Sequence, residues 1–177
     1  MRVGRRPVRP WRVWRARARG SLLIGDGARL GRPAQLDLAD GASLTLAPGA
    51  VVEPGLRVSV GPGARVDIGP GAILAEGCRL VAHAGIEVGE AARLDAEVSI
   101  VDLAQEHGDP EVPVRLQGAR AAPVRIGPGA HLGRAAGVEA GVTVGRDADV
   151  APHSVVDRDV PAGARVLGVP AREASPG

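Results

Sequence analysis

The sequence predicts an all-β protein, a parallel β-helix of hexapeptide repeats. An aliphatic residue returns at every sixth position along Ile126, Leu132, Val138, Val144, Val150 and Val156. Neither an α-helix nor an ordinary strand has that period. A small or slim residue stands four positions after each of the first five, at Ala130, Ala136, Val142, Ala148 and Ser154. This pattern is typical of a β-helix in which each unit forms a strand and a turn and three units close a coil. We therefore expect both residues of each unit to face the interior.

The same repeat runs, with interruptions, from Ile24 to Ile100. Hexads begin at Ile24, Leu30, Leu38, Leu46, Val52, Val60, Ile68, Leu74, Leu80, Val88 and Leu94. Their fifth, interior positions are Ala28, Ala34, Ala42, Ala50, Leu56, Ala64, Ala72, Cys78, Ala84, Ala92 and Val98. Each coil takes three hexads plus a few corner residues, which predicts about seven coils. Packing alone accounts for Cys78 at such a site.

Proline and glycine mark the predicted corners. They stand together at the third and fourth positions of several hexads: Pro48-Gly49, Pro54-Gly55, Pro62-Gly63, Pro70-Gly71 and Pro128-Gly129. Proline presets φ for the first turn residue, and glycine supplies the positive φ that the second residue of a type II turn requires.

Composition limits the class of protein. Phe and Tyr are absent and there are two Trp, so the core must be aliphatic. The 26 Gly and 15 Pro would also suit low-complexity disorder, but disorder gives no reason for a strict period. The single Cys excludes an intramolecular disulfide and fits a reducing compartment. Because no apolar run has the length of a membrane span or signal sequence, we expect a cytoplasmic protein.

The chain opens with a basic segment. Residues 1–20 hold eight Arg and no acid. Residues 12–19 largely alternate, which suits a half-buried strand, so we expect residues 1–23 to form a capping coil whose edge is blunted by charge. Weak contact of residues 1–20 with an anionic surface or substrate, or a disordered arm, stays open. Residues 24–172 would then be the β-helix domain and residues 173–177 a tail.

A loop at residues 101–124 interrupts the repeat once. It contains three prolines and no hexad frame, and loops of this length in a compact domain are usually functional or disordered. It carries His107, with Asp102, Glu106 and Asp109 nearby in sequence. A histidine beside carboxylates suits a general base, because a carboxylate fixes the ring tautomer and stabilises the charged form. A solvated histidine in an acidic loop is the alternative.

Residues 88–172 resemble the hexapeptide-repeat O-acetyltransferases, similar to maltose and galactoside acetyltransferases and to enzymes of exopolysaccharide biosynthesis. The resemblance rests on an ordered series of motifs: Asp102, His107, VRIGPGAHLG at 124–133, GVTVG at 141–145, SVVDRDVP at 154–161 and GVPAR at 168–172. It implies a left-handed helix, although crossover connections are normally right-handed. It also implies a homotrimer with the active site between subunits.

The resemblance assigns roles to particular residues. His107 would take the proton of an acceptor hydroxyl as it attacks the thioester of acetyl-CoA, with Asp102 or Glu106 as the orienting carboxylate. Positions that match the cofactor strip of the family are Arg134, Pro152, Ser154, Arg158 and Arg172, the last two near the CoA phosphates. The chemistry needs no metal. The resemblance thus implies transfer of an acetyl group from acetyl-CoA to a saccharide hydroxyl.

Some positions depart from the family pattern. His131 replaces a usual tryptophan, and Pro152 stands where the family often has alanine with a free N–H, which proline lacks. Asp157 replaces a more usual threonine and places a negative charge beside the presumed phosphates.

Other functions are less favoured. His83 and His153 fall at expected exposed turn positions, and no two histidines lie within five residues, which disfavours the zinc site of the related γ-type carbonic anhydrases. No nucleic-acid motif is present. A non-catalytic β-helix scaffold and an arginine-driven anion-binding module stay open as alternatives.

Overall fold

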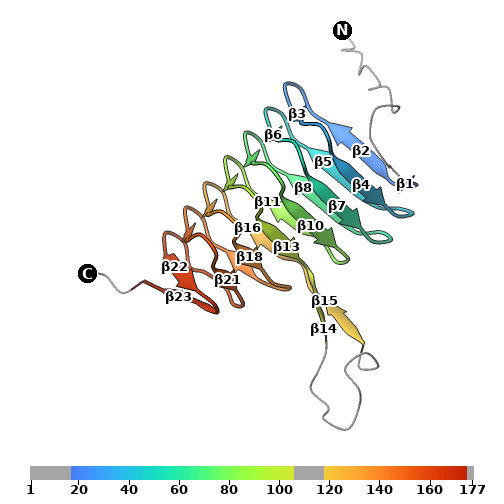
Figure 1. Cartoon of the computed structure of the whole chain (residues 1–177). Coiled ribbons are helices and arrows are strands. Elements are labelled where there is room, and N and C mark those ends of the chain that lie inside the picture. Colours follow the sequence, from blue (N-terminus) through green and yellow to red (C-terminus); the bar gives the residue numbers. More distant parts are fainter. Residues whose placement is uncertain (1–16, 106–117, 175–177) are drawn as a thin grey trace.

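The structure, a computed structural model, describes residues 17–105 and 118–174. In these residues the chain is a solenoid of short strands and turns without a helix, and the strands stack into three parallel sheets along its length. Figure 1 shows the coils in chain order, from β1–β3 at one end to β22–β23 at the other. The predicted β-helix is confirmed. The described residues contain no helix that could cross a membrane.

Successive coils contribute strands to three sheets in turn, except that the last coil meets sheet B only through the isolated bridge between Val160 and Val144. Sheet A consists of β1 (Arg17–Ala18), β4 (Gln35–Leu38), β7 (Arg57–Val60), β10 (Arg79–Ala82), β13 (Ser99–Val101), β18 (Gly137–Val138) and β21 (Val155–Val156). Sheet B consists of β2 (Ser21–Ile24), β5 (Ser43–Leu46), β8 (Arg65–Ile68), β11 (Ile86–Val88), β16 (Val124–Ile126) and β19 (Thr143–Val144). Sheet C consists of β3 (Arg29–Leu30), β6 (Val51–Val52), β9 (Ile73–Leu74), β12 (Arg93–Leu94), β17 (His131–Leu132), β20 (Asp149–Val150) and β22 (Arg165–Gly168), closed by the antiparallel β23 (Ala171–Glu173).

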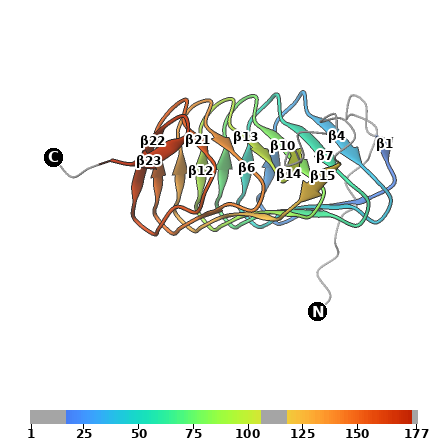
Figure 2. The same ribbon diagram turned by 90° about the horizontal axis from the view of Figure 1, so that it is seen from below.

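The coils are stacked in register. Leu44 lies opposite Val66, and Leu80 lies opposite Val58 on one side and Ile100 on the other. The solenoid makes about six full turns, close to the seven coils expected. Figure 2 shows these turns side by side along the length of the solenoid. The sense of the coil stays a prediction from the resemblance.

The core is the aliphatic interior that the repeat predicts. From Ala34 onward the predicted aliphatic residues are buried, and so are all but one of their small partners. Cys78 is fully buried, and burial raises the pKa of its thiol to about 11, which makes it an inert packing residue. Ile24, Ala28 and Leu30, in the first coil, are only partly buried.

Ala84 is the exception, since it is exposed. Leu80 and Ala82 of β10 both face inward, and the chain then turns through residues 83–85 before Ile86 enters the core. Ala82 is the register partner of Val60 and Ile86 that of Val66, so this corner is two residues shorter than the preceding one and the interior position of Ala64 has no counterpart here.

The corners use glycine in two ways. Gly49 and Gly71 have φ of +73° and +65°, as the predicted Pro-Gly turns require. Gly127 instead lies against the next coil, and a Cβ there would lie 2.6 Å from the backbone nitrogen of Arg146. The close stacking of the coils thus depends on a missing side chain.

Candidate active site

A β-hairpin interrupts the solenoid between β13 of sheet A and β16 of sheet B. Its strands β14 (Leu103–Gln105) and β15 (Ala119–Ala121) are antiparallel, with Leu103 opposite Ala121. Figure 1 shows the hairpin projecting away from the stack of coils. The predicted protruding loop is therefore present. His107 and Glu106 lie outside the described residues, so their roles stay predictions.

Asp102 anchors the base of the hairpin. Its carboxylate is buried and accepts three backbone hydrogen bonds, from the N–H groups of His83 at 2.7 Å, Ala84 at 2.7 Å and Gly85 at 2.6 Å. These donors form the corner of the preceding coil. Because both carboxylate oxygens are used there, the observed role of Asp102 is to fix the hairpin to the solenoid. Its orientation of His107 stays a prediction.

The following coil supports the other side of the hairpin base. The Ala122 N–H donates to the Asp102 carbonyl at 2.9 Å, and the Gly141 N–H donates to the Ala122 carbonyl at 3.0 Å. Next along this line of corners, the Asp159 carboxylate accepts a hydrogen bond of 2.7 Å from the Thr143 N–H. The A-to-B corners therefore form a continuous hydrogen-bonded ridge from residue 83 to residue 159, with the hairpin in the middle.

Three of the predicted cofactor residues lie on another ridge, the C-to-A corners. Arg134 Nη2 lies 2.7 Å from Glu97 Oε1, and both side chains are exposed. Pro152 is exposed in the next corner, where the N–H of His153 donates to the Arg134 carbonyl. Ser154 is buried, and its hydroxyl accepts a hydrogen bond of 3.0 Å from the Gly168 N–H. Of these three, Arg134 and Pro152 are accessible to a ligand and Ser154 is structural in its contacts.

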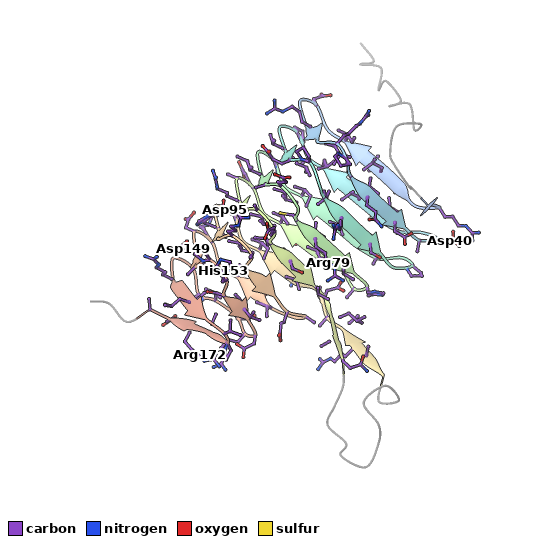
Figure 3. The ribbon with its side chains drawn as sticks, in the orientation of Figure 1. Asp40, Arg79, Asp95, Asp149, His153 and Arg172 are labelled. Carbon is purple, nitrogen blue, oxygen red and sulfur yellow. The ribbon has the colours of Figure 1, made fainter. Side chains whose placement is uncertain are left out.

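Arg158 and Arg172 meet at the C-terminal end of the solenoid, through Asp157. Asp157 Oδ1 lies 3.3 Å from Arg158 Nε and 3.0 Å from Arg172 Nη1. The hydrogen bond from Arg172 and then that from Arg158 lower the pKa of Asp157, which remains ionised. Asp157 therefore places a negative charge beside both arginines, and its effect on a bound phosphate stays a prediction. Figure 3 shows Arg172 at this end of the chain.

A histidine cluster on the outer face of sheet C joins three coils. His131 Nδ1 lies 2.9 Å from Asp149 Oδ1, and its Nε2 lies 3.1 Å from Asp95 Oδ2. Arg93 binds Asp95 at 3.0 Å, and Arg165 binds Asp149 at 3.2 Å. Figure 3 shows Asp95 and Asp149 on this face. Within the described ranges there is no group of three or more His, Cys, Asp or Glu that could hold a metal ion.

The cluster favours a charged histidine. Burial alone would lower the pKa of His131, but hydrogen bonds with Asp149 and Asp95 outweigh it and raise that pKa. Burial likewise opposes ionisation of Asp95, whereas its hydrogen bonds from Arg93 and His131 lower its pKa. In the sequence, His131 stands out only as a departure from the family pattern. A signal for the contact with Asp149 existed, since both residues precede an inward aliphatic and stand 18 positions, one coil, apart.

Comparisons with known proteins agree with the fold. No family model matches the chain. It is 32% identical over 87 residues to the probable acetyltransferase Rv3034c of Mycobacterium tuberculosis, a stretch that covers 49% of this chain and 29% of that protein. The chain therefore spans less than a third of the curated relative that it matches.

Solved structures extend the likeness to most of the chain. A variant of AntD, an N-acyltransferase from Bacillus cereus in complex with dTDP-4-amino-4,6-dideoxyglucose and coenzyme A, superposes with a TM-score of 0.72 at 16% identity, over 85% of this chain and 81% of that one. The polySia-specific acetyltransferase NeuO gives 0.63 at 17% identity, over 88% and 76%. The hexapeptide-repeat acetyltransferase VCA0836 from Vibrio cholerae gives 0.56 at 18%, over 86% and 72%.

The fold and these likenesses confirm the resemblance drawn from the motifs. The chain shares the β-solenoid fold of these acyltransferase structures.

Proposed function

We propose that the protein is an acetyl-CoA-dependent O-acetyltransferase with a saccharide acceptor. The main support for the proposal is the β14–β15 hairpin, which leaves the solenoid at an A-to-B corner, with His107 between its two strands in the sequence. The nearest described groups support a fixed hairpin base, because Asp102, Ala122 and Gly141 tie it to the coils on both sides. A fixed base is what a general base on a loop needs for reproducible geometry.

The reaction would follow ordinary acyl transfer. His107 accepts the proton of the acceptor hydroxyl as the oxygen attacks the thioester carbonyl, and backbone N–H groups stabilise the oxyanion. The C–O bond forms, the C–S bond breaks, and the histidine returns the proton to the thiolate of CoA. Products are the acetyl ester and free CoA thiol.

The exposed arginines fit a phosphorylated co-substrate. Arg158 and Arg172 share one carboxylate, so their cluster keeps a net positive charge, and a guanidinium retains further N–H donors for phosphate. We assign these two side chains to the CoA phosphates, with Arg134 and Pro152 along the neighbouring corner. We also propose that the protein is a cytoplasmic homotrimer in which the hairpin faces a cleft between subunits. Sedimentation or light scattering would test the trimer.

The deciding experiment is thiol release from acetyl-CoA across a panel of hydroxyl and amino sugars. We expect turnover with a hydroxyl acceptor, and a fall of about a hundred- to ten-thousand-fold in kcat for His107→Ala with acetyl-CoA affinity nearly unchanged. His83→Ala, at an exposed corner, is the matched control and should keep the parent rate.

Three results would change the proposal. Turnover with amino sugars only would assign N-acetylation. Parent-like turnover of His107→Ala would place the base elsewhere. No CoA binding and no thiol release with any acceptor would favour the scaffold.

A further inference from the structure

The outer face of sheet A carries two arginines stacked on each other. Arg57 of β7 and Arg79 of β10 are register partners in adjacent coils, and both side chains are exposed. Register partners in neighbouring strands lie about 5 Å apart. Gln35 precedes them in the same outward column, and Ser99 and Gly137 follow. The column therefore offers hydrogen-bond donors from four successive coils and no carboxylate, and we call Arg57 and Arg79 the arginine pair.

Several arginines of sheets B and C are paired with carboxylates. On sheet C, Arg93 and Arg165 bind Asp95 and Asp149. On sheet B, Arg125 lies 3.6 Å from Glu87 of its neighbouring strand. In the described part of the chain neither member of the arginine pair forms an ion pair or a hydrogen bond through its side chain, although Glu53 and Glu76 stand in the corners just before β7 and β10.

Stacking two like charges without a counter-charge destabilises a sheet. A ligand that carries the missing negative charge removes that repulsion and gains charge-assisted hydrogen bonds. Guanidinium groups suit phosphate in particular, since their planar forks bind two oxygens at once.

The pair lies next to the proposed reaction site. β13 is the next strand of sheet A after β10, and it leads directly into Asp102 and the hairpin. Asp102 stands three residues along the strand from Ser99, the register partner of Arg79. The separation is therefore about 10 Å along the strand and about 5 Å across it, comparable with the length of a sugar diphosphate. Figure 3 shows Arg79 in the middle of the molecule, on the side from which the hairpin leaves.

We propose that the arginine pair binds a phosphate or diphosphate group of the acceptor, so that the acceptor is a phosphorylated or nucleotide-linked sugar rather than a neutral glycan. This inference deepens the proposed function and rests on it for the identity of the reacting group. The binding of phosphate by Arg57 and Arg79 itself does not depend on catalysis.

The test is calorimetric titration of the full chain with inorganic pyrophosphate and with UDP. Arg57→Gln and Arg79→Gln should each weaken binding of both probes by about tenfold or more, because each removes charge-assisted hydrogen bonds. Arg65→Gln is the matched control, with the same charge change at an exposed position of sheet B, and it should alter binding by less than about twofold. Affinity for CoA should stay at the parent value in all three variants.

Thermal unfolding supplies a second readout. Each single variant removes a like-charge contact, so its Tm should equal or exceed that of the parent. A lower Tm would mark the pair as structural and overturn the proposal. It would also be overturned if the parent bound neither probe at millimolar concentrations, if Arg65→Gln weakened binding as much as the others, or if CoA affinity fell with the pair.

The two proposals can fail separately. Pyrophosphate binding that depends on the pair, without thiol release for any acceptor, would keep the arginine pair and reject the acetyltransferase. If the parent bound no pyrophosphate and Arg57→Gln left turnover of a neutral sugar unchanged, the acetyltransferase would be kept and the phosphate site at the arginine pair rejected.

Discussion

Asp102 and the His131 cluster both link neighbouring coils through carboxylates, but in different surroundings. Asp102 is fully buried, and its oxygens accept three backbone N–H groups at the base of the hairpin. In the cluster, His131 and Asp149 have side chains 40% and 39% exposed. A buried carboxylate that satisfies several donors is costly to remove, whereas exposed ion pairs contribute little. The Asp102 contact therefore fixes the base of the hairpin at the candidate site, whereas the His131 cluster adds only a small stabilisation on the outer face of sheet C.

The largest effect is expected from Asp102→Ala. The substitution removes the buried carboxylate that accepts the hydrogen bonds of the N–H groups of residues 83–85, at about 1 to 3 kcal/mol for each group left unsatisfied. Because water can partly replace the carboxylate, we expect a loss of about 3 to 5 kcal/mol in the free energy of unfolding, measured by urea denaturation. Turnover should fall with it as the hairpin base loosens.

Asp95→Ala, on the exposed face, is the comparison variant. It should cost about 1 kcal/mol or less. Equal losses for Asp102→Ala and Asp95→Ala would contradict the distinction between the two regions.

A smaller effect is expected for the arginines at the C-terminal end. Replacing both Arg158 and Arg172 by Ala should weaken CoA binding by on the order of 2 to 4 kcal/mol. The loss should be smaller with dephospho-CoA, which lacks the 3′-phosphate, and calorimetry measures both. Equal losses for the two ligands would remove the 3′-phosphate assignment.

Asp157→Asn is the opposing control for the same pair. Asp157 is paired with both guanidinium groups, so under the proposed assignment it competes with phosphate, and neutralising it should strengthen CoA binding severalfold. Weaker binding would show that the carboxylate is needed to hold the arginines in place.

The smallest effect is expected from pH at His131. Its pKa is raised in the folded protein, so its contribution to stability is full below about pH 6.5, the ordinary value, and is lost as pH rises through the raised value. The pKa of Asp95 is lowered, so that contribution is present above about pH 4 and is lost as pH falls further. The cluster should therefore be worth about 1 kcal/mol or less, at its maximum between about pH 4 and 6.5.

Urea denaturation of the parent and of His131→Gln across pH 4 to 9 would measure the contribution of the cluster to the free energy of unfolding. The difference between the two proteins should shrink as pH rises above about 6.5. Salt should reduce it further, because exposed charges are screened. A difference that grew with pH would contradict a charged histidine, and His83→Gln at an exposed corner should leave the profile unchanged.

Much of the fold was predictable from the sequence, because within one coil the determinants are local. Inward residues such as Leu132 and Val150 recur at six-residue spacing, and Pro-Gly pairs specify corners with positive φ at Gly49 and Gly71. The break at residues 101–124 also predicted where the hairpin leaves. Ala84 was placed inside because it stands four positions after Leu80. Only the register, which pairs Ala82 with Val60 and Ile86 with Val66, shows that this corner is two residues shorter and leaves Ala84 outside.

The contacts between coils were decided by the tertiary structure. Which outward side chains meet depends on the summed length of every corner and insertion between them, so a one-residue difference would change all later partners. Arg125 meets Glu87 across the whole hairpin insertion, and His131 meets Asp95 36 positions earlier. Asp102, predicted beside a catalytic histidine, is held by a corner 17 to 19 residues before it. The sequence by itself determined the repeat, the aliphatic interior and the place of the insertion, since these follow from local periodicity. The stacking register alone determined which charges are paired on sheets B and C and which arginines lie stacked and unpaired on sheet A.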